Sequence, residues 1–241
     1  MFLRKFRILL LFMFLQQMAK GNSMTDSVLV VNAGINGNNT TDLVGRVDKA
    51  VLQQSPQLVI MMIGTNDMLN TRNILSLKAY EDNYETLLNI LTKQASVLVM
   101  TIPPVNSSYI IMRKPELKFS ENGPTNRVDS ANHIIKRLAA KFNCQLIDLN
   151  NILMACGGSD TNKQSLFQNE ANSGTPDGVH PTADGYRVMA TAVYQNIVRS
   201  YPAVKKIVCF GDSITYGYNV DGGGTTDGQS YPALLKKMLN R

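Results

Sequence analysis

The chain has 241 residues, of which 44% are hydrophobic and 17% are charged, a composition typical of a folded globular protein rather than a disordered one. The formal net charge is +6, but much of this excess lies in the first 21 residues, which hold four basic residues and no Asp or Glu. The remaining basic residues are scattered and form no basic stripe, which argues against a nucleic-acid-binding protein.

The first 21 residues have the layout of a secretory signal peptide. A basic stretch, Met1–Arg7, precedes an uninterrupted apolar run, Ile8–Leu15, and Ala19 and Gly21 suit a cleavage site after position 21. The apolar run is too short to span a bilayer, which takes about 20 residues. We therefore expect a secreted or periplasmic protein without a stable membrane anchor, with residues 22–241 forming a single domain. A buried or amphipathic N-terminal helix is the alternative.

Apolar runs alternate with helical patterns along the rest of the chain. The runs predict strands at Val28–Val31, Leu58–Ile63, Val97–Met100, Leu146–Leu149 and Ile207–Phe210. Apolar residues at three- and four-residue spacing predict helices at Thr41–Gln54, Ala79–Gln94, Asn126–Phe142 and Ala183–Arg199. Continuous apolar runs favour parallel strands covered on both faces. The sequence thus predicts a three-layer α/β/α fold around a parallel sheet of about five strands, with ligand-binding loops at the carboxyl ends of the strands.

Four short segments place candidate catalytic residues just after a predicted strand or just before a predicted helix. Ser213 follows Ile207–Phe210 as a candidate nucleophile, and its own backbone N–H can face a developing oxyanion. Asp177 lies three residues before His180, close enough to orient the imidazole as a general base. Asn66 offers a side-chain amide and Gly37 a backbone N–H to the same oxyanion. Taken singly, each of these residues is also an ordinary turn residue.

The three cysteines and the second histidine do not form a recognisable site. The three cysteines are an odd number and cannot all pair within one chain, and Cys144 and Cys209 fit buried apolar positions, whereas the state of Cys156 is left open. His133 lies in a helical pattern as a structural or solvent-facing residue. No zinc-ligand spacing, Walker A motif or Rossmann glycine motif is present in the sequence. We therefore expect neither a metal nor an organic cofactor.

Together the four segments resemble the SGNH hydrolases, also called GDSL esterases and lipases. The matching blocks are Gly211-Asp212-Ser213-Ile214 for the nucleophile, Gly37 for the glycine, Gly64-Thr65-Asn66-Asp67 for the asparagine, and Asp177-x-x-His180 for the acid and histidine. The resemblance covers the chain from about Asp26 to Arg241. It implies a flavodoxin-like sheet and an esterase with Ser213, His180 and Asp177 as the triad, and an oxyanion hole formed by Ser213, Gly37 and Asn66.

The order of the blocks departs from the family pattern. Family members begin with the nucleophile block, whereas here it comes last. We expect a circular permutation with its cut between the family's first helix and second strand, which would place Ile207–Phe210 in the centre of the sheet beside Val28–Val31. Termini close in space make such a rearrangement tolerable. A fragment of a tandem gene and an engineered permutant are the alternatives.

The resemblance is closest to small-acyl esterases. The chain lacks a large apolar insertion that would cover a long acyl chain, so we expect a short acyl ester, acetyl on a sugar or glycan, as the small-molecule or glycan substrate. A lipase or lysophospholipase of the same fold is one alternative, and a non-catalytic glycan-binding module is another. The sequence makes no prediction of the oligomeric state.

Overall fold

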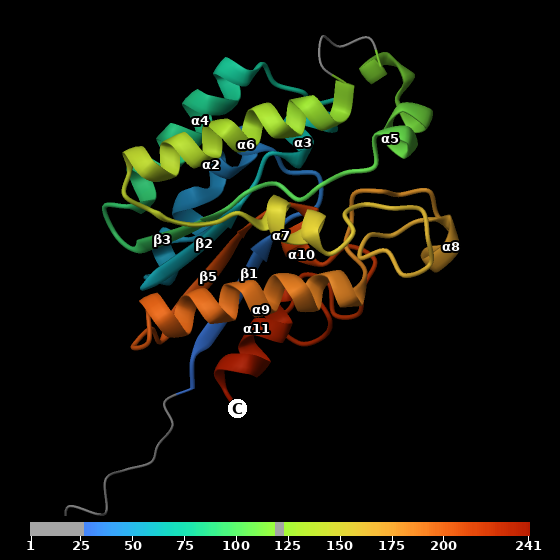
Figure 1. Ribbon diagram of the computed structural model, residues 1–241. Coiled ribbons are helices and arrows are strands. Elements are labelled where there is room, and N and C mark those ends of the chain that lie inside the picture. Colours follow the sequence, from blue (N-terminus) through green and yellow to red (C-terminus); the bar gives the residue numbers. More distant parts are fainter. Residues whose placement is uncertain (1–26, 119–122) are drawn as a thin grey trace, which may run out of the picture.

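The computed structural model describes residues 27–118 and 123–241, which contain a five-stranded, entirely parallel sheet in the order β1-β5-β2-β3-β4 (Figure 1). The strands are β1 (Leu29–Gly34), β2 (Leu58–Met62), β3 (Ser96–Met100), β4 (Gln145–Ile147) and β5 (Lys206–Gly211). The predicted α/β fold with a five-stranded parallel sheet is confirmed. The predicted signal peptide, residues 1–21, lies outside the described residues.

Helices cover both faces of the sheet (Figure 1). One face is covered by α2 (Thr40–Ala50), α3 (Thr65–Leu69), α4 (Leu77–Leu91) and α6 (Gly123–Lys141). The other face is covered by α7 (Leu149–Ala155), α9 (Ala183–Ser200) and α11 (Tyr231–Leu239). Short helices also lie in the connections: α5 (Ser107–Arg113) after β3, α8 (Glu170–Ser173) between α7 and α9, and α10 (Ser213–Tyr216) after β5.

Capping residues explain where the observed elements differ from the predicted ones. The Asn39 side chain accepts a hydrogen bond from the Asp42 N–H and so starts α2 one residue earlier than the apolar pattern predicted. Asp148 caps α7 by accepting from the Asn151 N–H, so the predicted strand Leu146–Leu149 is wrong at its end. The short helices α3, α5, α8 and α10 were not predicted, because they hold too few residues for an apolar periodicity.

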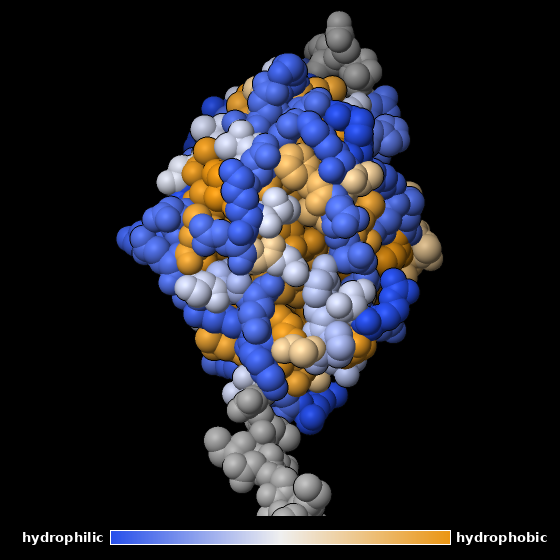
Figure 2. All heavy atoms as spheres, turned by 90° about the vertical axis from the view of Figure 1, so that its left-hand side faces the viewer, coloured by the Kyte–Doolittle hydropathy of each residue, from blue (hydrophilic) through white to orange (hydrophobic). Residues whose placement is uncertain are grey.

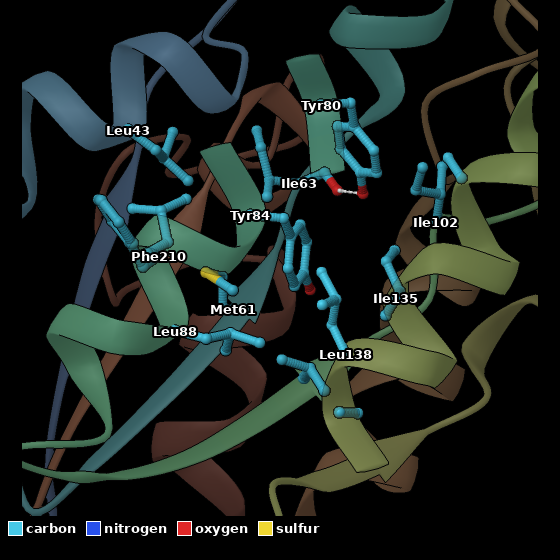
Figure 3. Packing of buried hydrophobic residues seen from close by; sticks show 14 of the residues in the cluster. Leu43, Met61, Ile63, Tyr80, Tyr84, Leu88, Ile102, Ile135, Leu138 and Phe210 are labelled. Atoms are coloured by element: carbon cyan, nitrogen blue, oxygen red, sulfur yellow. Dashed lines mark hydrogen bonds between the residues drawn. The ribbon is translucent and has the colours of Figure 1, made fainter. Parts of the chain in front are cut away.

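Residues of β2 point alternately into two apolar clusters on opposite faces of the sheet. Val59 and Met61 belong to the cluster under α4 and α6, whereas Ile60 belongs to the cluster under α9 and α11. Figure 3 shows the first cluster, in which the Tyr80 hydroxyl donates to the Ile63 carbonyl at 3.1 Å. This bond satisfies a buried polar group and fixes the carboxyl end of β2, where the segment with Asn66 begins.

The strand order brings three candidate loops to one edge of the sheet. β5 lies between β1 and β2, with Ala33 opposite Phe210 and Met62 opposite Gly211. The predicted position of Ile207–Phe210 beside the first strand is confirmed, although β5 is the second strand of the sheet and the central strand is β2. The carboxyl ends of parallel strands meet at one edge, so the segments carrying Gly37, Ser213 and Asn66 start side by side.

Figure 2 shows the side of the molecule that lies opposite the loops holding α8 and α10. Hydrophilic side chains cover most of this face, and apolar side chains show between them. Among residues 27–118 and 123–241, no helix combines the length and the apolar character needed to cross a membrane.

Candidate active site

Ser213 is the first residue of a helical turn that starts where β5 ends. Asp212 caps this turn through a 2.9 Å hydrogen bond from the Ile214 N–H to its carboxylate. Gly211 is needed here, because a Cβ at this position would lie 2.4 Å from the Met62 carbonyl oxygen. The chain therefore turns sharply out of the sheet and directs the Ser213 hydroxyl into the loops beyond it.

The hydroxyl of Ser213 lies at one end of a chain of hydrogen-bonded side chains. Its Oγ is 3.0 Å from His180 Nε2, and His180 Nδ1 is 2.9 Å from Asp177 Oδ2. The side chains of His180 and Asp177 are 16% and 13% exposed. The structure thus brings together the three residues that the sequence singled out, in an order that allows proton transfer from the hydroxyl to the imidazole.

Backbone and amide hydrogen bonds hold the segment that carries His180. The Asp177 carboxylate accepts from the backbone N–H groups of Val179 and His180 at 2.8 and 2.7 Å. Gln168, which is 4% exposed, flanks this segment on its other side, since its N–H donates to the His180 carbonyl and its own carbonyl accepts from the Gly178 N–H. The loop is therefore fixed at both sides of the imidazole.

The Gln168 side chain also connects the histidine segment with the nucleophile segment. Its amide nitrogen donates to the carbonyls of Pro181 at 3.1 Å and Tyr218 at 3.3 Å, while its amide oxygen accepts from Asn219. The Tyr218 N–H in turn donates to the Ser213 carbonyl, and the Tyr218 ring lies 4.6 Å from the His180 ring. Gln168 thus bridges the two parts of the chain that carry the nucleophile and the base.

Three candidate oxyanion donors line the same cavity as the Ser213 hydroxyl. Gly37 has a φ of +78°, a conformation that favours glycine. Among the described residues, neither the Gly37 N–H nor the Ser213 N–H donates to another residue. The Asn66 amide nitrogen donates one hydrogen to the Asn38 carbonyl at 2.9 Å, which fixes the amide and leaves its second hydrogen for a ligand.

Arg46 of α2 ties together the loops that follow β1 and β5. Its guanidinium donates to the Ala33 carbonyl at 3.0 Å, the Gly211 carbonyl at 2.8 Å and the Asn38 side chain at 2.6 Å. It also lies 4.6 Å from the centre of the Phe210 ring. One rigid planar group therefore sets the spacing between the Gly37 loop and the Ser213 turn.

Asp67 connects the Gly37 loop with the helix that carries Asn66. Its Oδ1 accepts from both the N–H and the hydroxyl of Thr40, at 2.9 and 2.5 Å. Its Oδ2 is buried and has no hydrogen-bond partner. Burial raises the pKa of Asp67, against the hydrogen bonds from Thr40 that lower it.

Ser213, His180 and Asp177 line a cavity of about 370 Å³. Most of its other lining residues are polar or charged: Asn36, Thr65, Asn70, Arg113, Lys114 and Thr175, beside the apolar Leu69 and Val179. Within residues 27–118 and 123–241, no cluster of three His, Cys, Asp or Glu side chains is arranged to hold a metal ion. The arrangement is suited to acyl transfer by a serine nucleophile.

Comparison with known proteins identifies the family. The model of the GDSL-like lipase/acylhydrolase family matches residues 14–188, which is well over half of the chain. The chain belongs to this family. As a GDSL-like acylhydrolase it is a carboxylic ester hydrolase.

Similar proteins include esterases from bacteria. An acetylxylan esterase from Geobacillus stearothermophilus is 28% identical over 179 residues, which cover 70% of this chain and 72% of the relative. A crystal structure of a lipase/acylhydrolase from Enterococcus faecalis is 25% identical with a TM-score of 0.53, covering 67% of this chain and 71% of that one. A crystal structure of the Geobacillus acetylxylan esterase has a TM-score of 0.53 at 22% identity, covering 68% and 69%, and shows similarity in fold.

Two carboxylates of this GDSL-like acylhydrolase have pKa values displaced in opposite directions. Burial by itself would raise the pKa of Asp177, but hydrogen bonds and the charge of His180 outweigh burial, so that the pKa lies below its ordinary value. Burial raises the pKa of Asp212 to about 6, partly offset by the hydrogen bond from Ile214 and by His180. Asp177 is therefore suited to stabilise a charged imidazole, whereas Asp212 is a buried cap.

Sequence reasoning missed the residues that hold the candidate site residues in place. Arg46 had a detectable signal, since it lies three residues after the buried Leu43 and next to the buried Val47, on the apolar side of α2. Gln168 and Tyr218 had none, because they lie in long polar loops without periodicity. His133 is exposed and Cys209 is buried in β5, as expected, whereas the expected burial of Cys144 is wrong, because it lies half-buried just before β4. Cys156 is exposed.

Proposed function

We propose that the chain hydrolyses acetyl esters of carbohydrates through Ser213, His180 and Asp177. The observation that carries this proposal is the continuous chain from Ser213 Oγ through His180 Nε2 and Nδ1 to Asp177, at 3.0 and 2.9 Å. His180 takes the proton of the hydroxyl as the Ser213 oxygen attacks the ester carbonyl. The imidazolium then gives that proton to the departing sugar oxygen, and the acyl group stays on Ser213.

The oxyanion formed by this attack needs donors on one side of the ester. The N–H groups of Ser213 and Gly37 and the second Asn66 hydrogen meet this need, and each donor in such a hole contributes roughly 3–4 kcal/mol to transition-state stabilisation. A water molecule, activated by His180, then attacks the acyl-serine. Acetic acid leaves, and the Ser213 hydroxyl regains its proton from the imidazolium.

The polar lining supports a short acyl group on a polar alcohol. Leu69 and Val179 are the aliphatic residues among those that line the cavity of about 370 Å³, too little apolar surface to cover a long acyl chain. The acetylxylan esterase relative points the same way. Hydrolysis of 4-nitrophenyl acetate, octanoate and palmitate should fall steeply with chain length; equal or rising rates would favour a lipase or lysophospholipase.

The triad is tested by Ser213→Ala. We expect loss of measurable hydrolysis of 4-nitrophenyl acetate, because no other group in the cavity is placed to form the acyl intermediate. Ser200→Ala, at the exposed end of α9, should keep the full rate. Full activity of Ser213→Ala would exclude this nucleophile. A fluorophosphonate probe that labels the wild type but not Ser213→Ala would exclude a purely glycan-binding module.

We also propose that the chain is circularly permuted relative to its family. In support, β5 and the Ser213 block lie between β1 and β2 although they come last in the chain, and the family model stops at residue 188, before that block. In further support, Asn240 accepts from the Val28 N–H at 2.7 Å and donates to its carbonyl at 3.0 Å, so the end of α11 lies where the family's second strand would begin.

A relinked variant tests the permutation. This variant runs from Lys205 to Arg241, continues through a short linker to Ser27, and ends at Tyr201. We expect it to fold and to hydrolyse 4-nitrophenyl acetate at the parent rate. An unfolded product would contradict the permutation. Activity of the parent chain that disappears on dilution would favour the tandem-gene alternative, in which two copies complete each other's site.

Export is the remaining part of this proposal. It is supported by the basic and apolar layout of residues 1–21 alone. Mass spectrometry of the protein recovered outside the cytoplasm should find an N-terminus near Asn22. An intact Met1 on that protein would exclude cleavage of a signal peptide.

A further inference from the structure

Two adjacent cations line the catalytic cavity on the side where α5 ends. Arg113 is the last residue of α5 and Lys114 follows it, and both share the cavity with Ser213 and His180. In the part of the chain that the structure describes, neither forms an ion pair with a carboxylate within 4.0 Å. The reaction proposed above assigns no task to either charge.

Backbone carbonyls hold both cations in the cavity. The Lys114 ammonium donates to the Leu69 carbonyl at 2.6 Å, and the Arg113 guanidinium donates to the carbonyls of Pro176 and, at 2.6 Å, Asp177. A carbonyl oxygen carries only a partial charge, so these bonds orient the cations without neutralising them. An ammonium has three donor hydrogens and a guanidinium has five, which leaves donors for a ligand.

The balance of charge in the cavity is positive. The one carboxylate among its lining residues is Asp177, whose oxygens face His180 at 2.9 and 3.1 Å. Burial, followed by the neighbouring charge of Arg113, lowers the pKa of Lys114, whereas Glu116 raises it and Arg72 makes a smaller contribution that lowers it. An anion placed between the two cations would relieve this unfavourable arrangement.

Arg127 makes a similar contact with the end of α3 from outside the cavity. Its guanidinium donates to the Met68 carbonyl at 2.9 Å and the Leu75 carbonyl at 3.1 Å, so it binds the end of α3 much as Lys114 does. Burial lowers its pKa as well. Arg127 does not line the catalytic cavity. The two residues thus share a structural contact and differ in their access to substrate.

We propose that Lys114 and Arg113 form a carboxylate subsite, and that the substrate is an O-acetylated uronic acid unit of an acidic glycan. The sugar carboxylate lies between the two cations while the acetyl carbonyl lies against Ser213. Charge-assisted hydrogen bonds of this kind are roughly twice as strong as neutral ones, and a positive cleft also attracts an anionic substrate before contact. This inference rests on the proposed esterase activity and narrows its substrate class.

A matched pair of substrates tests the subsite. One is an O-acetylated methyl glucuronoside, and the other is the methyl glucoside acetylated at the same hydroxyl, so the two differ only in the carboxylate. The wild type should hydrolyse the acidic ester with a kcat/KM about tenfold higher than the neutral ester, since one well-placed charged contact is worth about a factor of ten or more. Raising the salt concentration from about 0.05 M to about 0.5 M should reduce this ratio.

Variants separate the charge from the structural contact. Lys114→Gln should lower the ratio of acidic to neutral kcat/KM by about tenfold, and Lys114→Arg should retain most of it. Arg127→Gln should leave the ratio unchanged. A wild-type ratio of one or less, or an equal loss on both esters in Lys114→Gln, would overturn the subsite. Absence of wild-type hydrolysis of 4-nitrophenyl acetate would instead overturn the esterase proposal itself.

Discussion

Buried and half-buried charges hold one side of the cavity beside Ser213, and a buried neutral amide holds the other. On the side of Ser213 and Gly37, the charged groups Arg46, Asp67 and Asp212 fix the loops. On the side of Asp177 and His180, the Gln168 amide and backbone hydrogen bonds do so, while the charged Arg113, which also donates to the Asp177 carbonyl, is exposed. A buried charged group costs far more to leave unpaired than a neutral amide. The first side should therefore govern stability and its pH dependence, and the second side should govern the rate.

The largest effect is expected at Arg46. Arg46→Met removes donors to the Ala33 and Gly211 carbonyls and to the Asn38 side chain, and should lower the free energy of unfolding by about 3 kcal/mol, because three part-buried, charge-assisted hydrogen bonds are lost together. Urea unfolding followed by circular dichroism measures this. Arg187→Met, which breaks an ion pair with Asp184 at the exposed start of α9, should cost less than about 0.5 kcal/mol. Equal losses in the two variants would contradict the comparison.

The neutral side is tested at Gln168. Gln168→Leu removes the two amide donor bonds to Pro181 and Tyr218, which should lower kcat for 4-nitrophenyl acetate by about tenfold while KM changes little, since each such bond contributes about 1 kcal/mol. Steady-state kinetics separates the two constants. Gln164→Leu, in the same loop but exposed, is the control. A change confined to KM, or to stability alone, would argue against a positioning role.

The smallest effect is expected from the pH dependence of Asp212. Its pKa of about 6 lies above the unfolded value of 3.8, so the folded state binds the proton more tightly than the unfolded chain does. Protonation of Asp212 therefore stabilises the folded state at low pH, and this stabilisation is lost as the pH rises through about 6. Asp212→Asn keeps the oxygen that accepts from Ile214. Between pH 5 and pH 7 the free energy of unfolding should fall by about 1 kcal/mol more in the wild type than in the variant. The same pH dependence of the free energy of unfolding in the wild type and the variant would place the Asp212 pKa at its ordinary value.

Residue type and chain order were enough to predict the parallel sheet, whereas the place of β5 beside β1 and the set of residues that meet at Ser213 followed from the resemblance to the GDSL family. Continuous apolar runs fix parallel strands, and the carboxyl ends of parallel strands must share one edge. The residues that hold the site in place could not be predicted in this way. Gln168 acts through contacts with residues at positions 178–181 and 218–219, which only the folded loops bring together. Arg113 ends a short helix without periodicity and Lys114 follows it, so nothing in the sequence indicated that they reach the cavity.

The pair of hydrogen bonds between Asn240 and Val28 has a practical consequence. These bonds place residue 241 and residue 27 at the amino end of β1, while the catalytic cavity lies beyond its carboxyl end. A resin or electrode coupled through either position would therefore hold the enzyme with its cavity facing the solution. Joining the two positions into a covalent ring would need only a few residues and would reduce the entropy of the unfolded chain, which should raise its resistance to heat.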